Sequence, residues 1–411
     1  MNPRRQKWAE GAAGFLLSVQ SPMGARSVPH GAITLYGTCY AWMGLYYLGQ
    51  DVSGSKDTIE SLIRSCQIGE NGFFEGPELR GFVAHTGTKH DYQHLQLHLA
   101  CSAVLPVVQQ LGISIEPIHG AHEFCSLVRL ENWQSGIDWK HAWFEGNNIL
   151  FVGQLLVYLR DVEKHPGAAE ALKLWFDWLD RTADPVTGLW GTNGFCSPME
   201  AVYGGYHQLL VYYHENHPLP NAHGLVDTVL ALQHDDGGFN PDGNGGACED
   251  VDSVDILVNC YKRIDYRRAE IRHALRRCLK HILSTQNPDG GFPYNRNQKQ
   301  SHMGIPATEA SPNVSCTFPT WFRIHTLALI AEVLPNEAAL KGIPFRFNKA
   351  LSMGWHASPP DWVPVSDEVT VGERMLMARI KIRQLAQLAR RGVRLASRYS
   401  GKLLHSRLLG P

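Results

Sequence analysis

One phrase occurs twice in the sequence, as Leu232-Gln-His-Asp-Asp-Gly-Gly-Phe239 and as Thr285-Gln-Asn-Pro-Asp-Gly-Gly-Phe292. In both copies an apolar helical pattern ends at a Gln, a tight glycine turn follows, and a Phe comes next. A third copy, Asp184-Pro-Val-Thr-Gly-Leu-Trp190, keeps the turn and the aromatic residue, and looser copies precede it. The copies recur about every 50 residues, with one longer gap that leaves room for a degenerate copy near 125–136. We therefore predict six repeated units.

Amphipathic helical patterns lie between the turns, with apolar residues three and four positions apart. We expect an inner helix after each glycine turn, at roughly 34–49, 89–111, 143–160, 201–214, 250–262 and 320–333. We expect an outer helix next in each unit, at roughly 56–66, 121–132, 167–182, 221–233, 267–285 and 336–351. Hairpins of this period must bury their apolar faces on their neighbours, which gives either an open solenoid or a closed ring.

Six units suit closure of the ring. The predicted fold class is therefore all-α: an (α/α)6 barrel, or toroid, of about six helical hairpins over residues 1–352, with a linker and a basic amphipathic C-terminal helix over 353–411. In a closed ring the loops that enter the inner helices lie at one end, so their polar residues converge on one cavity. Residues near the starts of the inner helices are therefore the candidates for function.

Composition and charge fit a globular chain in a reducing compartment. Hydrophobic residues make up 44% of the chain, and a net charge of −1 gives no overall signal for a nucleic-acid partner. The nine cysteines are scattered without a CxxC pair, so we expect reduced thiols and neither a disulfide framework nor a zinc knuckle. The N-terminal segment lacks a cleavage site, and no stretch reaches about 18 uninterrupted apolar residues, so we expect a cytoplasmic location.

Four acidic residues, Glu249, Asp250, Asp252 and Asp255, crowd one predicted helix start directly after a glycine-rich loop. Carboxylates this close repel each other, so one of them can keep its proton near neutral pH and act as an acid. Acidic residues in the first turn of a helix also cap it and stabilise its dipole, which is the structural alternative. All four are candidates for catalysis.

The turn phrase and the acids after it resemble the QW repeat and the acid motif of squalene-hopene cyclases and related class II terpene cyclases. The resemblance covers about residues 220–300 well and implies proton-initiated chemistry on an isoprenoid, with Asp252 as the acid and Asp250 as its partner. The family's motif is Asp-x-Asp-Asp, whereas this chain has Ser253 at the last position. Class II cyclases also combine two helical barrels, and this chain supplies one.

Protein prenyltransferase beta subunits use a single barrel of this kind, and the chain is similar to them in its repeat rhythm. Their zinc site needs an Asp-x-Cys-Tyr at this helix start, where this chain has Asp250-Val-Asp252. We therefore expect no metal site and no resident cofactor. Mg²⁺ would be needed only if the substrate carried a diphosphate.

Histidines and aromatic residues near other inner-helix starts complete the predicted site. His90, His94 and His98 lie four residues apart on one helical face, which suits proton transfer or substrate hydrogen bonding, and the Glu of a metalloprotease motif is missing. His90 and His207 join the acids as catalytic candidates. The substrate-binding candidates are His94, Trp143, Asn147, Tyr203, Tyr206, Trp321 and Arg323. Each of these residues also serves as an ordinary core or capping residue in helical proteins.

The expected partner is a small molecule, and its class stays open. His, Asp, Asn, Tyr and Trp side chains make a more polar lining than a hydrocarbon needs, which favours a carbohydrate-active (α/α)6 enzyme such as a uronyl epimerase, lyase or hydrolase. A non-catalytic toroid that binds a glycan, a lipid or a protein is the third hypothesis. The fold alone does not choose among them.

The C-terminal tail is strongly basic. Residues 373–408 hold ten Lys or Arg against one acid, with Leu, Ile, Met and Val at helical spacing. A basic amphipathic helix of this kind suits an anionic membrane surface, which would place the protein at the inner face of the membrane. A solvated helix clamped on the outside of the barrel is the alternative, and no nucleic-acid partner is expected.

Overall fold

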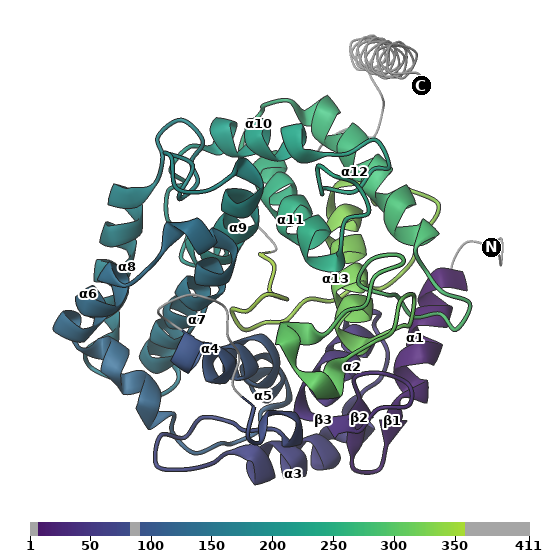
Figure 1. Cartoon of the computed structure of the whole chain (residues 1–411), viewed down its shortest axis with the longest axis horizontal. Coiled ribbons are helices and arrows are strands. Elements are labelled where there is room, and N and C mark those ends of the chain that lie inside the picture. The colour runs from purple at the N-terminus through teal and green to yellow at the C-terminus, as the bar shows by residue number, and fades with distance from the viewer. Residues whose placement is uncertain (1–6, 83–90, 358–411) are drawn as a thin grey trace, which may run out of the picture.

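The helical patterns form a closed ring of two layers, which the computed structural model describes over residues 7–82 and 91–357 (Figure 1). In these residues six helical segments form the inner layer, and consecutive segments pack on each other until the last meets the first. They are α2 (Leu35–Tyr47), α4 (Asp91–His98) continued through a π-helical stretch (Leu99–Val104) into α5 (Leu105–Leu111), α7 (Ala142–Asp161), α9 (Pro198–His214), α11 (Ala247–Arg263) and α13 (Thr317–Val333). The predicted all-α toroid is confirmed.

The outer layer covers the ring with amphipathic helices. α12, for example, buries Ile271, Leu275 and Leu279 on one face and leaves the half-buried Arg276 and Arg277 and the exposed Lys280 on the other. Inner helices such as α11 are instead buried on nearly every side. The outer helices are α1 (Lys7–Ser18), α3 (Lys56–Cys66), α6 (Leu127–Ser135), α8 (Ala168–Thr182), α10 (Ala222–Leu232) and α12 (Arg268–Ser284). Among the residues described, no helix is both long and apolar enough to cross a membrane.

Short elements fill the connections. Strands β1 (Gln20–Ser21), β2 (Gly24–Arg26) and β3 (Ile33–Thr34) form a small antiparallel sheet before α2. The 3-10 turns are η1 (Ser53–Ser55), η2 (Pro77–Leu79), η4 (His119–Cys125), η5 (Trp139–His141), η6 (His302–Gly304) and η7 (Pro306–Thr308). The last two belong to the long loop that leads into α13.

The repeated Gln fastens each unit to the next. Gln286 Nε2 donates to the carbonyl of Gly290 in its own turn at 2.7 Å and to the carbonyl of Trp8 in α1 at 2.8 Å. Gln233 makes the same two contacts with its own turn, at 2.9 Å, and with α12, at 2.8 Å. Gln67, in a looser copy, bonds its turn and the segment before η4, both at 2.8 Å. The phrase is therefore a coupling between units as well as a turn.

The predicted outer helix at 336–351 is wrong. This segment forms turns, since Pro335 and Pro344 remove backbone donors near its two ends. The N-terminal helix α1 takes the sixth outer place instead, and Trp8 Nε1 donates to the carbonyl of Ala339 at 2.8 Å. Each hairpin therefore runs from an outer helix to an inner one, the reverse of the predicted order.

Residues 345–357, which we call the strap, run back along the inner helices (Figure 1). Tyr47 Oη donates to the carbonyl of Gly354 at 2.5 Å, and Tyr206 Oη donates to that of Met353 at 3.0 Å. The Lys262 ammonium contacts His356 in the strap. These contacts hold Met353 against the centre of the ring. The predicted basic helix lies outside the described residues from 358 onward.

The inner helices α7 and α9 cross where each has a glycine, and this crossing generates a stability prediction. A Cβ on Gly146 would lie 2.4 Å from the carbonyl oxygen of Gly204, so the two backbones touch. Gly146→Ala should force the helices apart and lower the free energy of unfolding by about 1–3 kcal/mol in urea denaturation.

Gly14→Ala is the matched control, because the exposed Gly14 in α1 has nothing within 4 Å of an added Cβ. It should leave stability unchanged or raise it by about 0.5–1 kcal/mol. Equal losses in both variants would contradict a close crossing.

Candidate functional site

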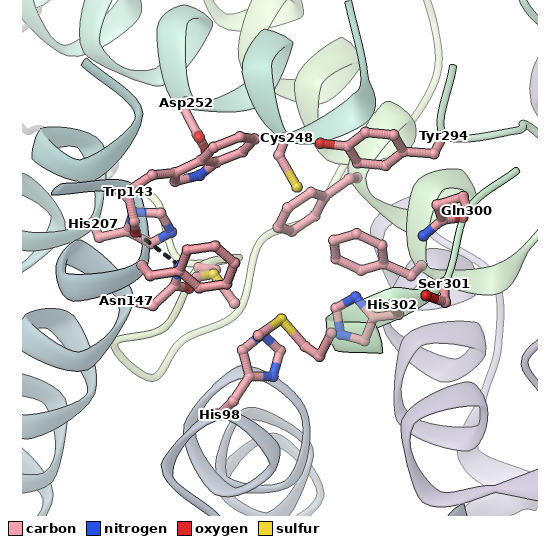
Figure 2. A pocket seen from close by; sticks show the side chains of 15 residues that line it. His98, Trp143, Asn147, His207, Cys248, Asp252, Tyr294, Gln300, Ser301 and His302 are labelled. Carbon is pink, nitrogen blue, oxygen red and sulfur yellow. Dashed lines mark hydrogen bonds between the residues drawn. The ribbon is translucent and has the colours of Figure 1, made fainter. Parts of the chain in front are cut away.

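A cavity of about 210 Å³ opens between the inner helices near the axis of the ring (Figure 2). The first turns of α7, α11 and α13 supply much of its wall, as predicted for the starts of inner helices, and α4, α9, the loop before α13 and the strap supply the rest. The lining residues are His98, Trp143, Phe144, Asn147, His207, Cys248, Asp252, Tyr294, Gln300, Ser301, His302, Met303, Phe318, Phe322 and Met353.

Asp252 is the one carboxyl group on this wall among the described residues. Its side chain is 1% exposed, and neither oxygen makes a hydrogen bond of ordinary geometry. Burial raises the pKa of Asp252 well above its usual value, and the neighbouring carboxylates, first Glu249, raise it further, while a weak contact with the Trp143 indole N–H lowers it in part. Burial therefore favours the protonated, neutral form of Asp252, whose carboxyl group faces the cavity.

Asp250 and Arg323 form a fully buried ion pair beside the cavity. Asp250 also accepts the backbone N–H of Phe239 at 2.9 Å, next to the glycine turn. Arg323 donates to the carbonyls of Gly245 and Tyr294 at 3.0 and 3.1 Å. The pair thus joins two repeats and fixes the loops around the cavity. Neither side chain is on the cavity wall, so the structure gives both a positioning role.

The two other acids are buried in separate contacts. Glu249 accepts a hydrogen bond from Tyr294 Oη at 2.7 Å, which holds that phenol on the cavity wall. Asp255 accepts from Asn259 at 3.0 Å, and burial raises the pKa of Asp255 to about 7, against the opposing charge of Lys262. The acidic cluster therefore divides into one group on the cavity wall and three behind it.

His207 lies on the cavity wall, as predicted, with a defined tautomer. Its Nδ1 is 2.8 Å from the carbonyl oxygen of Tyr203, and a carbonyl can only accept, so Nδ1 carries the hydrogen. Burial lowers the pKa of His207 to about 4. The ring is therefore neutral, and Nε2 keeps its lone pair, which makes His207 a base.

Two of the predicted binding residues, Trp143 and Asn147, also line the cavity, and Asn147 is held by a 3.2 Å bond to the carbonyl of Trp143. Tyr203, Tyr206 and Trp321 are fully buried behind it. The two tyrosine hydroxyls bond the carbonyls of Phe239 and Met353, and Trp321 stacks on Tyr40 with ring centroids 4.7 Å apart. These three residues support the wall and do not form it.

The predicted histidine row separates in the structure. His94 is fully buried, shares a 2.9 Å hydrogen bond with Asn148, and packs against Phe144 and His98. His98 lines the cavity, although nothing in the residue pattern distinguishes it from the other two histidines. His90 lies outside the described residues.

The loop before α13 supplies five lining residues that are not among the predicted site residues: Tyr294, Gln300, Ser301, His302 and Met303. This loop also leads into an inner helix, so its place on the cavity wall follows the predicted rule. The loop is long and has no helical periodicity, so the sequence pattern does not indicate which of its side chains point into the cavity. Met353 gave no sequence signal at all, because it reaches the cavity only through the strap.

The described residues offer no group of three or more His, Cys, Asp or Glu that could hold a metal ion. All nine cysteines are free thiols. The site therefore consists of a buried acid, neutral imidazoles, amides and a hydroxyl on a wall of aromatic and sulfur-containing side chains.

Comparison with known proteins places this geometry in a family. One similar solved structure is a polysaccharide lyase, with a TM-score of 0.46 and 13% sequence identity; the match covers 80% of this chain and 99% of the lyase chain. Another is a family 88 glycosyl hydrolase from Bacteroides vulgatus, with a TM-score of 0.44 and 14% identity; this match covers 79% of this chain and 98% of the hydrolase chain. No curated protein matches by sequence. The model of the prenyltransferase alpha-alpha toroid domain matches residues 10–134 and 149–309, most of the chain, as the resemblance in the repeats implied. The protein therefore belongs to the prenyltransferase alpha-alpha toroid family.

Proposed function

We propose that the protein is an enzyme that protonates an uncharged isoprenoid in the toroid cavity, with Asp252 as the acid. One observation carries this proposal: the carboxyl group of Asp252 faces the cavity, is buried, and makes no hydrogen bond of ordinary geometry among the described residues. A group in this state costs free energy unless a ligand engages it. Burial raises the pKa of Asp252 and so favours the protonated form that a general acid needs.

The charge state of the whole wall supports an uncharged substrate. Burial shifts the pKa of each titratable lining group toward its neutral form: His98, His207, Cys248, Asp252, Tyr294 and His302. A charged substrate group would enter this wall without a counter-charge from these residues. The aromatic faces of Trp143, Phe318 and Phe322 would instead stabilise a carbocation that forms inside the cavity.

The acid and the base suit one reaction sequence. Asp252 gives its proton to an alkene carbon, the π electrons form the new C–H bond, and a carbocation remains. Nε2 of His207 then takes a proton from a neighbouring carbon, and the electrons of that C–H bond form a double bond. The imidazolium and the carboxylate return to their neutral forms through solvent, so the net reaction is an isomerisation. It is a cyclisation where the π electrons of a second double bond in the substrate attack the carbocation and form a C–C bond before the proton is lost.

A neutral saccharide is the second candidate substrate. Asn147, Gln300 and Ser301 place amide and hydroxyl groups on the same wall, which suits hydrogen bonds to sugar hydroxyls. The same acid and base would then transfer protons on the sugar, as in an epimerase, lyase or hydrolase.

Asp252→Asn tests the proposal directly. Wild type and variant are incubated in heavy water with squalene, prenyl alcohols, prenyl diphosphates, and neutral and uronate oligosaccharides, and products are read by mass spectrometry. We expect wild type to place deuterium in a rearranged isoprenoid, and Asp252→Asn to be slower by about 10²–10⁴-fold. Asp242→Asn, on the exposed part of the same loop, is the control and should behave as wild type. Deuterium in a sugar would move the enzyme to the carbohydrate class, and no reaction on either panel would favour a binding toroid.

The carboxyl group behind Asp252 predicts a pH dependence of stability. The pKa of Asp255 is about 7 in the folded chain and about 4 when unfolded, so folding takes up a proton between these values. Wild-type stability therefore falls as pH rises from about 4 to 7, by up to about 4 kcal/mol from this group. Asp255→Asn should remove that loss, so its stability relative to wild type should rise across the same window in urea denaturation. A pH-independent difference would show that Asp255 is ionised in the folded protein.

We also infer that the basic tail attaches the protein to anionic membranes, since residues 373–408 carry ten Lys or Arg against one acid. Deletion of 370–411 should abolish sedimentation with vesicles that contain phosphatidylglycerol, and wild type should lose binding in high salt. Unchanged sedimentation of the truncated chain would refute the attachment.

A further inference from the structure

Two imidazoles that the proposed reaction does not use face the same cavity. His98 ends α4 and His302 begins η6, about two hundred residues later in the chain, yet their ring centroids are 5.0 Å apart. Figure 2 shows them across the cavity from Asp252, on the opposite wall. Buried hydroxyl groups on the side away from the cavity connect the two imidazoles through hydrogen bonds.

The connection is a continuous chain of hydrogen bonds. His98 Nδ1 lies 3.1 Å from Ser102 Oγ, and Ser102 Oγ lies 2.9 Å from Tyr40 Oη. Tyr40 Oη in turn lies 3.2 Å from His302 Nε2. A second phenol, Tyr36, reaches His98 Nδ1 at 2.8 Å. All five side chains are at least nine-tenths buried, so water does not compete for these bonds.

Counting hydrogens couples the two rings, because the hydroxyl chain can run in either of two matched directions. In one direction, Nδ1 of His98 accepts from Ser102 and shares its single lone pair with the Tyr36 hydroxyl, which leaves the ring hydrogen on Nε2. Ser102 then donates to His98 and accepts from Tyr40. Tyr40 has used its hydrogen, so it accepts from His302 Nε2. The nitrogen left without a partner is Nδ1 of His302, which keeps a lone pair.

We propose that His98 and His302 form a second proton-transfer site, joined by a relay through Ser102 and Tyr40. His302 Nδ1 takes a proton from a substrate C–H or O–H. His302 Nε2 then passes its proton to Tyr40, Tyr40 to Ser102, and Ser102 to His98 Nδ1. His98 Nε2 finally delivers its own proton to another atom of the same substrate. One bond to hydrogen breaks, one forms, and the substrate's electron pair shifts between them, so the net reaction is a hydrogen transposition.

This relay refines the proposed function and rests on it only for the location of the substrate. It suits a neutral wall, because a transposition leaves no net charge on the protein. It also sets a requirement for the substrate, which must offer an acidic hydrogen and an acceptor atom on one face, within reach of both rings. After one turnover the relay runs in the opposite sense, and exchange at the two cavity-facing nitrogens resets it.

Histidine tautomers test the relay without any substrate. In ¹⁵N NMR of the full chain, with His98→Gln and His302→Gln used for assignment, both rings should carry their hydrogen on Nε2. The reversed relay would place both hydrogens on Nδ1, which is also consistent. One ring of each kind would overturn the proposal.

Tyr40→Phe breaks the relay while keeping the ring that stacks on Trp321. His302 should then lose its fixed tautomer, and Ser102→Ala should uncouple the two rings in the same way. Tyr212→Phe is the matched control, since it removes a buried phenol that bonds Asp180 far from this chain, and it should leave both tautomers unchanged. Circular dichroism and thermal unfolding check that each variant folds.

Turnover separates the failure of the relay from the failure of the proposed function. With any substrate that wild type converts, Tyr40→Phe should slow hydrogen transposition by about tenfold or more, and Asp252→Asn should leave the tautomers as in wild type. Matched tautomers that respond to Tyr40→Phe support the relay even if no isoprenoid reacts. Tautomers that ignore Tyr40→Phe refute it even if Asp252 proves catalytic.

Discussion

The side-chain amide of the repeated Gln makes two hydrogen bonds that no backbone group could make together. One bond closes the glycine turn of its own unit, and the other reaches the next outer helix. The turn needs glycine because Gly237 and Gly290 have φ values of 100° and 89°, in the left-handed region. Local turn geometry and packing between units are thereby fixed by one side chain. A ring built of such couplings closes only when the last unit finds a partner, which here is Trp8 in α1.

The same couplings determine what the cavity contains. Each turn fixes the height at which the following inner helix starts, so side chains in those first turns meet near the axis. The buried pair of Asp250 and Arg323 adds a second constraint, because it ties the start of α11 to α13 and holds Gly245 and Tyr294 in place. Asp252, two residues after Asp250, is thereby directed into the cavity without a hydrogen bond of ordinary geometry. Asp250 is therefore a positioning residue, because its ion pair with Arg323 fixes the helix start that carries Asp252.

Much of this could be predicted from the sequence, and the rest could not for identifiable reasons. Periodicity and the turn phrase gave the toroid, the five outer helices after α1, and the candidates Asp252, His207, Trp143 and Asn147. The prediction of the sixth outer helix at 336–351 was wrong because that place is taken by α1, from the other end of the chain. Hydrophobic periodicity reports local helix formation and carries no information on contacts between the two ends of the chain. Arg323 looked like a substrate ligand because its partner belongs to another repeat. The loop around His302 has no period, so only the folded ring shows which of its residues face inward.

Burial explains why acid, base and relay coexist in one small cavity. The pKa of a carboxylic acid rises and that of an imidazole falls in the same dry wall, so both groups are neutral over a common pH range. A neutral acid can only give its proton, and a neutral imidazole can take one or exchange one. The wall therefore moves protons without holding charge before the reaction begins. A carbocation that forms on the substrate then contacts aromatic faces and polarised N–H or O–H groups. This wall therefore favours a short-lived carbocation over the binding of a substrate that is already charged.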